Sequence, residues 1–527
     1  MTILGRGTRV SHTGRGLRWG TAALTGAAAL SAAALAIPAP AQAGLPGGSS
    51  SSEYIVSAPG DALSAVVNDV IQAGAPVVES FAFINALATD LDSSQVSMLE
   101  SIPGLVVTPD ATVNVQGSSG GSSGRAPAAV FPAQSGATQL WAQGNTGQGV
   151  NVAVLDTGIT PLPDFAGRLV DGVDLSGGNN PWDDQYGHGT FVAGLIAGDG
   201  ASSDGQYTGE APGAGLVSVK VAGASGQTDL ATIIEGVGWT IAHEAVDNIR
   251  VLNMSLGSVP SESTVLNPLD NAVEAAWESG IVVTVSAGND GPDNGTILSP
   301  GDDPMVITAG AVDDLGQTNP ADDAMTTFSS IGPTNPDGWF KPDLVTSGRS
   351  VVSLRDPGST IDAENPSARI GSANFVGSGT SFSSAITAGA AALLLSDHPS
   401  DSPDTVKGTL LGTTVPGPVG NPFVDGHGIL DVAAADASTP MTLNQSPLTQ
   451  ATALGSDVFL GLSGLSSTWN PANWTGSTWN GSTWNGSTWN GSTWNGSTWN
   501  GSTWNGSAWD GSTWNGSTWN GSTWNGS

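Results

Sequence analysis

The pattern of apolar and polar residues divides the chain into a small and a large structured part. In the small part, residues 53–115, extended and helical patterns alternate along five segments: 53–56, 63–73, 77–91, 93–102 and 105–115. The third segment alternates apolar and polar residues, whereas the second and fourth have apolar residues at helical spacing. The order strand, helix, strand, helix, strand predicts a small α+β domain with a split βαβ pattern.

The large part, residues 137–438, has short apolar runs separated by longer helical stretches. The runs are continuous, as is typical of strands buried on both faces, and lie at 150–155, 216–221, 251–256, 281–285 and 305–312. Helical patterns at 230–245 and 269–279 lie between them. This alternation predicts an α/β domain with a mostly parallel sheet, whose ligand crevice lies beyond the carboxyl ends of the strands.

Both the start of the chain and the segment between the two parts indicate processing. An Arg-bearing stretch, an Ala/Leu-rich run (20–37) and Ala41-Gln42-Ala43 predict a signal peptide over residues 1–43. A membrane anchor is the alternative, and the apolar run is barely long enough for one. Residues 116–136, which include a Gly/Ser repeat at 117–124, are predicted to be a flexible linker where a precursor can be cut. We therefore expect a secreted, extracellular protein without a membrane span after processing.

Composition excludes several classes of function. The chain has no cysteine, so disulfides and cysteine chemistry are absent. Its 46 acidic residues face only 13 Lys and Arg, and four of these 13 lie in the first eighteen positions. With no basic stripe to neutralise phosphates, nucleic acid is not expected as a partner.

Four polar residues follow or open the apolar elements of the large part. Asp156 ends the first run, and His188 stands between two glycines before a small-residue helix. Asn289 follows the fourth run, and Ser381 opens an Ala-rich helix whose N-terminal amides would face an oxyanion. Taken singly, each has an ordinary alternative: a turn Asp, a structural His, a turn Asn and a capping Ser.

Together these motifs resemble one known family. Val-Leu-Asp-Thr-Gly, Gly-His-Gly-Thr, Ala-Gly-Asn and Gly-Thr-Ser occur in the order found in the subtilisin family of serine proteases. The resemblance covers about 137–438 and implies a three-layer subtilisin-like fold that hydrolyses peptide bonds through an acyl-enzyme. It implies that Asp156, His188 and Ser381 form a catalytic triad and that the side-chain amide of Asn289 belongs to the oxyanion hole. It also implies that catalysis needs no cofactor.

The resemblance also implies partners for this site. Substrate polypeptides would bind along two edge segments and the residues before the oxyanion amide: Ser225, Gly226, Gln227, Ser255, Leu256, Gly257, Ala287 and Gly288. Residues 53–115 resemble the inhibitory pro-segment that assists folding in this family. Members often bind structural calcium, but the acidic residues at 199–204 and 302–303 show no ligand spacing, so no metal site is predicted.

Two residues near the catalytic motifs depart from the family pattern. Phe191 stands where the family commonly has His, and Phe382 follows Ser381 where the family commonly has Met. Neither change removes a catalytic group. We expect both to affect side-chain preference and the geometry at the helix start.

The C-terminal region, residues 439–527, is dominated by a pentapeptide repeat of Trp, Asn, Gly, Ser and Thr. It places twelve tryptophans between Trp469 and Trp524. One interpretation is a disordered low-complexity tail. The other is an array of indoles that attaches the protein to a polysaccharide or cell wall and gains avidity by repetition.

Three other functions are compatible with parts of the sequence. Asp156-Thr157-Gly158 could indicate an aspartic protease, but it occurs once and such an enzyme needs two. A catalytically inactive binding protein would keep the fold, although it would normally lose one of the four groups. A mainly adhesive protein would depend on the tail.

Overall fold

The computed structural model describes residues 51–58, 63–115, 129–443 and 445, together with eleven dipeptides of the tail. The predicted signal peptide and most of the predicted linker therefore lie outside the described residues. Among the described residues, no helix combines the length and apolar character needed to cross a membrane.

The small part forms a four-stranded antiparallel sheet with two helices. The strand order is β2-β3-β1-β4, and the elements are β1 (Ser52–Ser57), α1 (Leu63–Gln72), β2 (Glu79–Phe81), β3 (Ala86–Leu91), α2 (Ser93–Glu100) and β4 (Val106–Pro109). Buried Val56, Leu87 and Leu99 belong to its own hydrophobic core. Asp92 caps α2 by accepting from the amides of Ser94 and Gln95.

Two predicted extended segments of the small part are interrupted in the structure. Between β2 and β3 the chain forms a 3-10 turn (η1, Ala82–Ile84), and Asn85 adopts a left-handed conformation with φ of 53°. Phe81 and Ile84 pack into the core of the large part, so this stretch serves two cores. The last segment divides into β4 and β5 (Thr112–Val115), and β5 pairs with strands of the large part.

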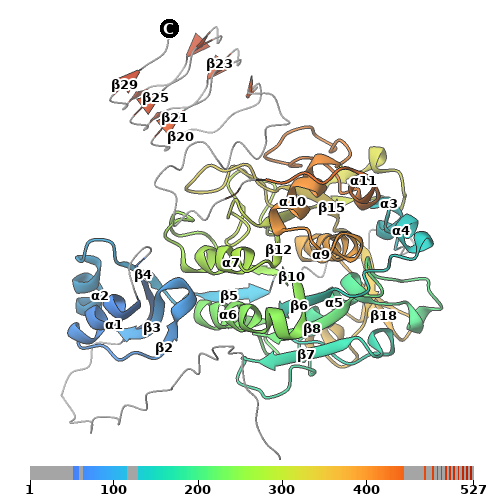
Figure 1. The fold of residues 1–527 in the computed structure, drawn as a ribbon, viewed down its shortest axis with the longest axis horizontal. Coiled ribbons are helices and arrows are strands. Elements are labelled where there is room, and N and C mark those ends of the chain that lie inside the picture. Colours follow the sequence, from blue (N-terminus) through green and yellow to red (C-terminus); the bar gives the residue numbers. More distant parts are fainter. Residues whose placement is uncertain are drawn as a thin grey trace, which may run out of the picture. The chain divides into compact units, whose positions relative to one another are not determined.

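The large part is built on an eight-stranded sheet (Figure 1). Seven strands follow the order β14-β13-β12-β10-β6-β8-β7, and β15 (Leu344–Ser347) also pairs with β13. All pairs are parallel except β13 with β14. The bounds are β6 (Asn151–Asp156), β7 (Leu169–Asp174), β8 (Gly215–Lys220), β10 (Ile249–Met254), β12 (Val282–Ser286), β13 (Ile307–Asp313) and β14 (Ala324–Met325). The five predicted runs are all strands, whereas β7, β14 and β15 of this sheet were not predicted.

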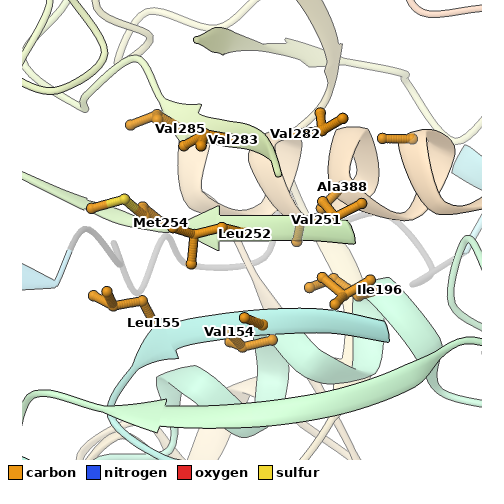
Figure 2. Packing of buried hydrophobic residues seen from close by; sticks show 14 of the residues in the cluster. Val154, Leu155, Ile196, Val251, Leu252, Met254, Val282, Val283, Val285 and Ala388 are labelled. Atoms are coloured by element: carbon orange, nitrogen blue, oxygen red, sulfur yellow. The ribbon is translucent and has the colours of Figure 1, made fainter. Parts of the chain in front are cut away.

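Two pairs of helices pack against this sheet. α5 (His188–Ala197) contacts α9 (Thr380–Asp397), and α6 (Leu230–Asp247) contacts α7 (Pro268–Glu278). Figure 2 shows valines and leucines of β6, β10 and β12 packed with Ile196 of α5 and Ala388 of α9. The residues of α9 from Thr380 to Leu395 are all buried. Gly389 is needed in this helix because a Cβ there would lie 2.5 Å from Cβ of Glu210.

The ordered large part begins earlier than the sequence indicates. Helix α3 (Phe131–Gln134) lies inside the predicted linker and is followed by α4 (Ala137–Gln143). The side chain of Phe131 is only 1% exposed and belongs to the main core, which explains why this segment is folded. The remaining elements are β9 (Gln227–Asp229), β11 (Leu256–Gly257), β16 (Val351–Leu354), α8 (Thr360–Glu364), η5 (Pro366–Ala368), β17 (Arg369–Ile370), β18 (Asn374–Gly377), α10 (Pro403–Gly412) and α11 (Val432–Ala437), with short 3-10 turns η2 (Pro163–Phe165), η3 (Ala201–Ser203) and η4 (Pro320–Asp322).

The described dipeptides of the tail are short strands that pair in parallel. Thr478-Trp479 pairs with Thr498-Trp499, which pairs in turn with Thr518-Trp519. The remaining described dipeptides also pair with the dipeptide twenty residues away. A spacing of twenty residues equals four pentapeptides, so each dipeptide pairs with the one four repeats away. These regular strand pairs were not predicted from the sequence.

Candidate active site

The carboxylate at the end of β6 and the imidazole at the start of α5 are in direct contact. Nδ1 of His188 lies 2.9 Å from both Oδ1 and Oδ2 of Asp156, and both side chains are buried. Gly187 precedes the helix with φ of 100°, a conformation that favours glycine. The carboxylate therefore fixes the ring orientation and selects the tautomer with a proton on Nδ1.

Asp184 links the two segments that carry this pair. Its Oδ1 accepts from the amide of Gly187 at 2.7 Å and from Oγ1 of Thr157 at 2.7 Å, and its Oδ2 accepts from the amide of Thr190 at 2.8 Å. Burial raises the pKa of Asp184, although these hydrogen bonds oppose the shift. No role for Asp184 was predicted from the sequence. A carboxylate four residues before the helix start was the available signal.

Ser381 is the second residue of α9 and lies beside the end of β10. Its Oγ donates to the carbonyl of Ser255 at 3.3 Å, and Oγ of Ser255 donates to the carbonyl of Ser381 at 3.0 Å. Nδ2 of Asn253 donates to Oγ of Ser255 at 2.9 Å. This network holds the helix start against the sheet, with the serine at the positive end of the α9 dipole.

The side chain of Asn289 is anchored to the same helix start. Its Oδ1 accepts from the backbone amide of Thr380 at 2.9 Å and from Oγ1 of Thr380 at 3.1 Å. The amide nitrogen belongs to the same planar group, so these two hydrogen bonds to the oxygen fix its orientation as well. Sequence reasoning did not identify Thr380 as the residue that fixes this orientation.

The two residues that depart from the family pattern contact each other near the imidazole. The ring of Phe382 stacks on His188 with centroids 5.8 Å apart, and its centroid lies 4.5 Å from that of Phe191. Since Phe382 follows Ser381 directly, this contact places the imidazole beside the helix start. Nε2 of His188 is buried and makes no hydrogen bond within the described residues.

Strand β5 of the small part lies between two of the predicted substrate-binding segments. Asn114 pairs with Gly257 of β11 on one side and with Gln227 of β9 on the other. Val115 pairs with Leu256, and its amide donates to the carbonyl of Gly226 at 3.0 Å. Strand β5 is thus paired with Gln227 on one side and with Leu256 and Gly257 on the other, as an added strand would be in β-augmentation.

The other two predicted substrate-binding residues contact their own domain. The amide of Ala287 donates to Ala309, and its carbonyl accepts from Leu298. The amide of Gly288 donates to Oγ1 of Thr380 at 3.2 Å. Their backbone bonds therefore support the segment before Asn289.

The acidic pair at 302–303 is buried near two lysines. Burial raises the pKa of Asp303 to about 6, and Lys341 opposes that shift. Nζ of Lys341 lies 2.6 Å from Oδ2 of Asp343, and Lys407 lies 3.2 Å from Oδ1 of the same carboxylate. Within the described ranges, no group of three or more His, Asp or Glu is arranged to hold a metal ion.

Comparison with known families decides the identity. The subtilase family matches residues 147–442 of the chain. The chain belongs to this family. The resemblance inferred from the four motifs is therefore confirmed, as is the α/β fold with its mostly parallel sheet. Subtilases are serine endopeptidases, in keeping with the serine, imidazole and carboxylate described above.

Individual subtilases match over different lengths. Serine protease AprX of Bacillus subtilis (strain 168) is 48% identical over 276 residues, which is 51% of this chain and 62% of AprX. Subtilisin NAT of Bacillus subtilis subsp. natto is 34% identical over 71% of this chain and 86% of its own length. Among solved structures, fervidolysin from Fervidobacterium pennivorans, a keratinolytic enzyme related to subtilisin, has a TM-score of 0.58 at 23% identity and covers 75% of this chain and 62% of its own. That structure supports the fold.

Proposed function

We propose that the chain is a secreted serine endopeptidase, made as a zymogen that processes itself, with Asp156, His188 and Ser381 as the catalytic triad. The contact of Nδ1 of His188 with the Asp156 carboxylate carries this proposal, because it is the arrangement that prepares an imidazole to act as a general base. The buried position of Ser381 at the start of α9 supports its role as the nucleophile.

In the proposed mechanism each group has one task. Oγ of Ser381 turns from the Ser255 carbonyl, gives its proton to Nε2 of His188 and attacks the scissile carbonyl carbon. Asn289 and the amide of Ser381 donate to the oxyanion while Asp156 stabilises the imidazolium. The Nε2 proton then passes to the leaving amine, and the C–N bond breaks to leave an acyl-enzyme. Water hydrolyses this ester by the same steps and restores Ser381.

The pairing of β5 supports an inhibitory role for residues 53–115. An extended peptide held between β9 and β11 occupies the edges that a substrate backbone would use, so substrate and β5 compete. Val115, the last residue of β5, pairs with Leu256, and the carbonyl of the neighbouring Ser255 accepts from the Ser381 hydroxyl. This supports cleavage of the precursor by its own active site, between residues 115 and 136.

For the tail we propose attachment to a cell wall or polysaccharide. The repeated Thr-Trp dipeptides and their parallel pairing support a regular array with many equivalent positions, which gains avidity by repetition. A chain that ends near Ser438 should lose attachment to the producing cell's wall and keep peptidase activity. Equal attachment of the truncated and full-length proteins would refute this role.

One experiment tests the peptidase proposal as a whole. The wild-type chain and its Ser381→Ala variant are expressed with their N-terminal region, and the secreted products are identified by intact mass. We expect the wild type to appear cut between residues 115 and 136 and to degrade an unfolded polypeptide, whereas Ser381→Ala stays uncut and inactive. A Ser381→Ala protein that is still processed and active would contradict the proposal and would favour another catalytic group.

A further inference from the structure

The charged side chains of the proposed pro-segment are all acidic, and the chain as a whole is acidic too. Residues 53–115 contain no Lys, Arg or His and eight carboxylates, namely Glu53, Asp61, Asp69, Glu79, Asp90, Asp92, Glu100 and Asp110. The whole chain carries a formal net charge of −33. Two bodies of the same sign repel each other, so their association is opposed by long-range electrostatics.

Carboxylates from both sides meet at the N-terminus of α6. Oδ1 of Asp110, in the loop after β4, accepts from the amide of Ala231 at 2.9 Å. Oδ1 of Asp229, at the end of β9, accepts from the amide of Thr232 at 2.8 Å. Asp229 also pairs with Thr112 of β5. One helix end therefore holds two carboxylates, one from the pro-segment and one from the peptidase domain.

A second set of facing carboxylates lies between β2 and α6. Burial raises the pKa of Glu79 to about 7, and Glu235, Glu53 and Asp229 each add to the shift. Burial also raises the pKa of Asp110, with Asp229 adding to it and the amides at the helix start opposing it. Strand β2, which carries Glu79, contacts α6, which carries Glu235, and no basic side chain contributes to either shift.

The other titratable groups of the neighbouring elements do not neutralise this set. Helix α6 carries one base, His243, whose ring stacks on Trp239 and whose Nδ1 lies 2.8 Å from the Trp239 carbonyl. Glu262 adds a further carboxylate at the contact with β4, where Thr108 donates to it at 2.7 Å. Asp90 of β3 also faces Glu53.

Apolar contacts provide the attraction that holds the two parts together. Phe81 and Ile84, around η1, belong to the core of the large part. A Cβ at Gly238 of α6 would lie 2.7 Å from the ring of Phe83, so this ring rests directly on the helix backbone. The complex thus combines a hydrophobic contact with carboxylates of like sign on neighbouring elements.

We propose that these opposed carboxylates form a pH-dependent seal that keeps the cleaved pro-segment bound in acid and releases it as the pH rises. The inference rests on the proposed role of residues 53–115 as an inhibitory pro-segment. It adds the controlling variable, which is the protonation of Glu79, Asp110 and their neighbours across the interface.

The direction of the effect follows from proton binding. A carboxyl whose pKa is higher in the complex than in the separated parts binds its proton more tightly in the complex. The affinity is therefore greatest below the ordinary glutamate value of 4.5 and falls as the pH rises to about 7, the value for Glu79 in the complex. Above that range this group contributes no further change.

The test uses the secreted full-length protein after its first cut, purified at pH 5 with the pro-segment still bound. Samples are held at pH 5, 6, 7 and 8 in low salt, and timed aliquots are assayed at one common pH on a small peptide amide. Size-exclusion chromatography on parallel aliquots measures the pro-segment still bound. We expect the half-time of release to fall at least about tenfold between pH 5 and 7.5. At pH 7.5, about 200 mM NaCl should lengthen it, because salt screens the repulsion.

Two variants with the same change in formal charge distinguish an effect of the seal from an effect of the pro-segment's overall negative charge. Glu79→Gln should lengthen the half-time at pH 7.5 at least about threefold and flatten its pH dependence. Glu100→Gln, on the exposed side of α2, should behave as the wild type. Equal half-times for both variants, or release that slows with rising pH, would overturn the seal. Activity without any lag at every pH would instead overturn the inhibitory role itself.

Discussion

Nδ1 of His188 lies 2.9 Å from each carboxylate oxygen of Asp156, and both side chains are buried. A contact of this kind orients the imidazole so that Nε2 is the nitrogen that exchanges a proton with the nucleophile. Thr157, directly after Asp156, joins this pair to Asp184 through its hydroxyl, and the same hydroxyl accepts from the amide of Gly189 at 2.9 Å. The position of the imidazole therefore depends on groups other than Asp156.

We expect Asp184→Asn to lower kcat/KM about 100-fold, mainly through kcat. The change replaces one carboxylate oxygen, which accepts hydrogen bonds, by an NH₂ group, which would face the donors that Asp184 now binds. This displaces the start of α5, which carries His188. Steady-state kinetics on a peptide amide, with a thermal unfolding curve for each protein, measure the effect. Asp183→Asn is the matched control because that side chain is exposed and adjacent. Equal kinetics for both variants would show that Asp184 does not position the base.

Asn289→Ala should reduce kcat about 10²–10³-fold with little change in KM. That magnitude is the one known for the oxyanion asparagine of a subtilisin, so it is transferred from a relative. The amide would no longer donate to the oxyanion, and Thr380 would lose the acceptor for its amide and hydroxyl. Thr380→Ser, which keeps the hydroxyl, should retain most of the activity. A large rise in KM at constant kcat would indicate ground-state binding instead.

Phe382→Leu should lower kcat about tenfold and leave KM nearly unchanged, because the imidazole loses the ring that packs against it. Phe423→Leu provides a matched control, since Phe423 stacks on Phe340 at 4.5 Å in a comparable ring pair of its own. Circular dichroism verifies that both variants are folded. If both substitutions reduce kcat equally, the effect is one of general stability and not of His188 orientation.

Glu210 should make the protein less stable at alkaline pH. Burial raises the pKa of Glu210 to about 8, although Ser135 hydrogen-bonds to its Oε1 at 2.5 Å and opposes the shift. The folded state thus retains a proton that the unfolded state loses near pH 4.5. Stability from this group is complete below that pH and falls until about pH 8, by up to about 5 kcal/mol.

Denaturant unfolding of the Ser381→Ala protein, which cannot digest itself if our proposal is correct, tests this at pH 5 and pH 9. Glu210→Gln should remove most of the difference in the free energy of unfolding between the two pH values. Glu278→Gln, at an exposed position at the end of α7, should leave the difference unchanged. A difference that persists in Glu210→Gln would assign the pH dependence to other groups.

The sequence predicted the strands whose residues form continuous apolar runs. Continuous apolar runs became β6, β8, β10, β12 and β13 because strands buried on both faces need apolar residues at every position. Asp156 and Asn289 could be placed because each follows such a strand. The edge strand β7 was missed because its residues are only partly buried and include acidic ones.

Features that depend on two distant segments could not be predicted. Residues 77–91 alternate as a strand should, but Phe81 and Ile84 pack into the large core, so the strand is broken by η1. The roles of Asp184 and Thr380 arise from hydrogen bonds to residues brought close only by the fold. In the tail, each Thr-Trp dipeptide pairs with another twenty residues away, and the five-residue period of the sequence does not reveal this spacing.

The central claim is that Ser381 is a nucleophile activated by His188. Labelling of the processed protein with a fluorophosphonate, followed by peptide mass spectrometry, tests it directly. We predict a single phosphonylated peptide with the added mass on Ser381, and loss of labelling in His188→Ala with the fold intact. Absence of labelling in folded wild-type protein, or modification of a different serine, would contradict the account.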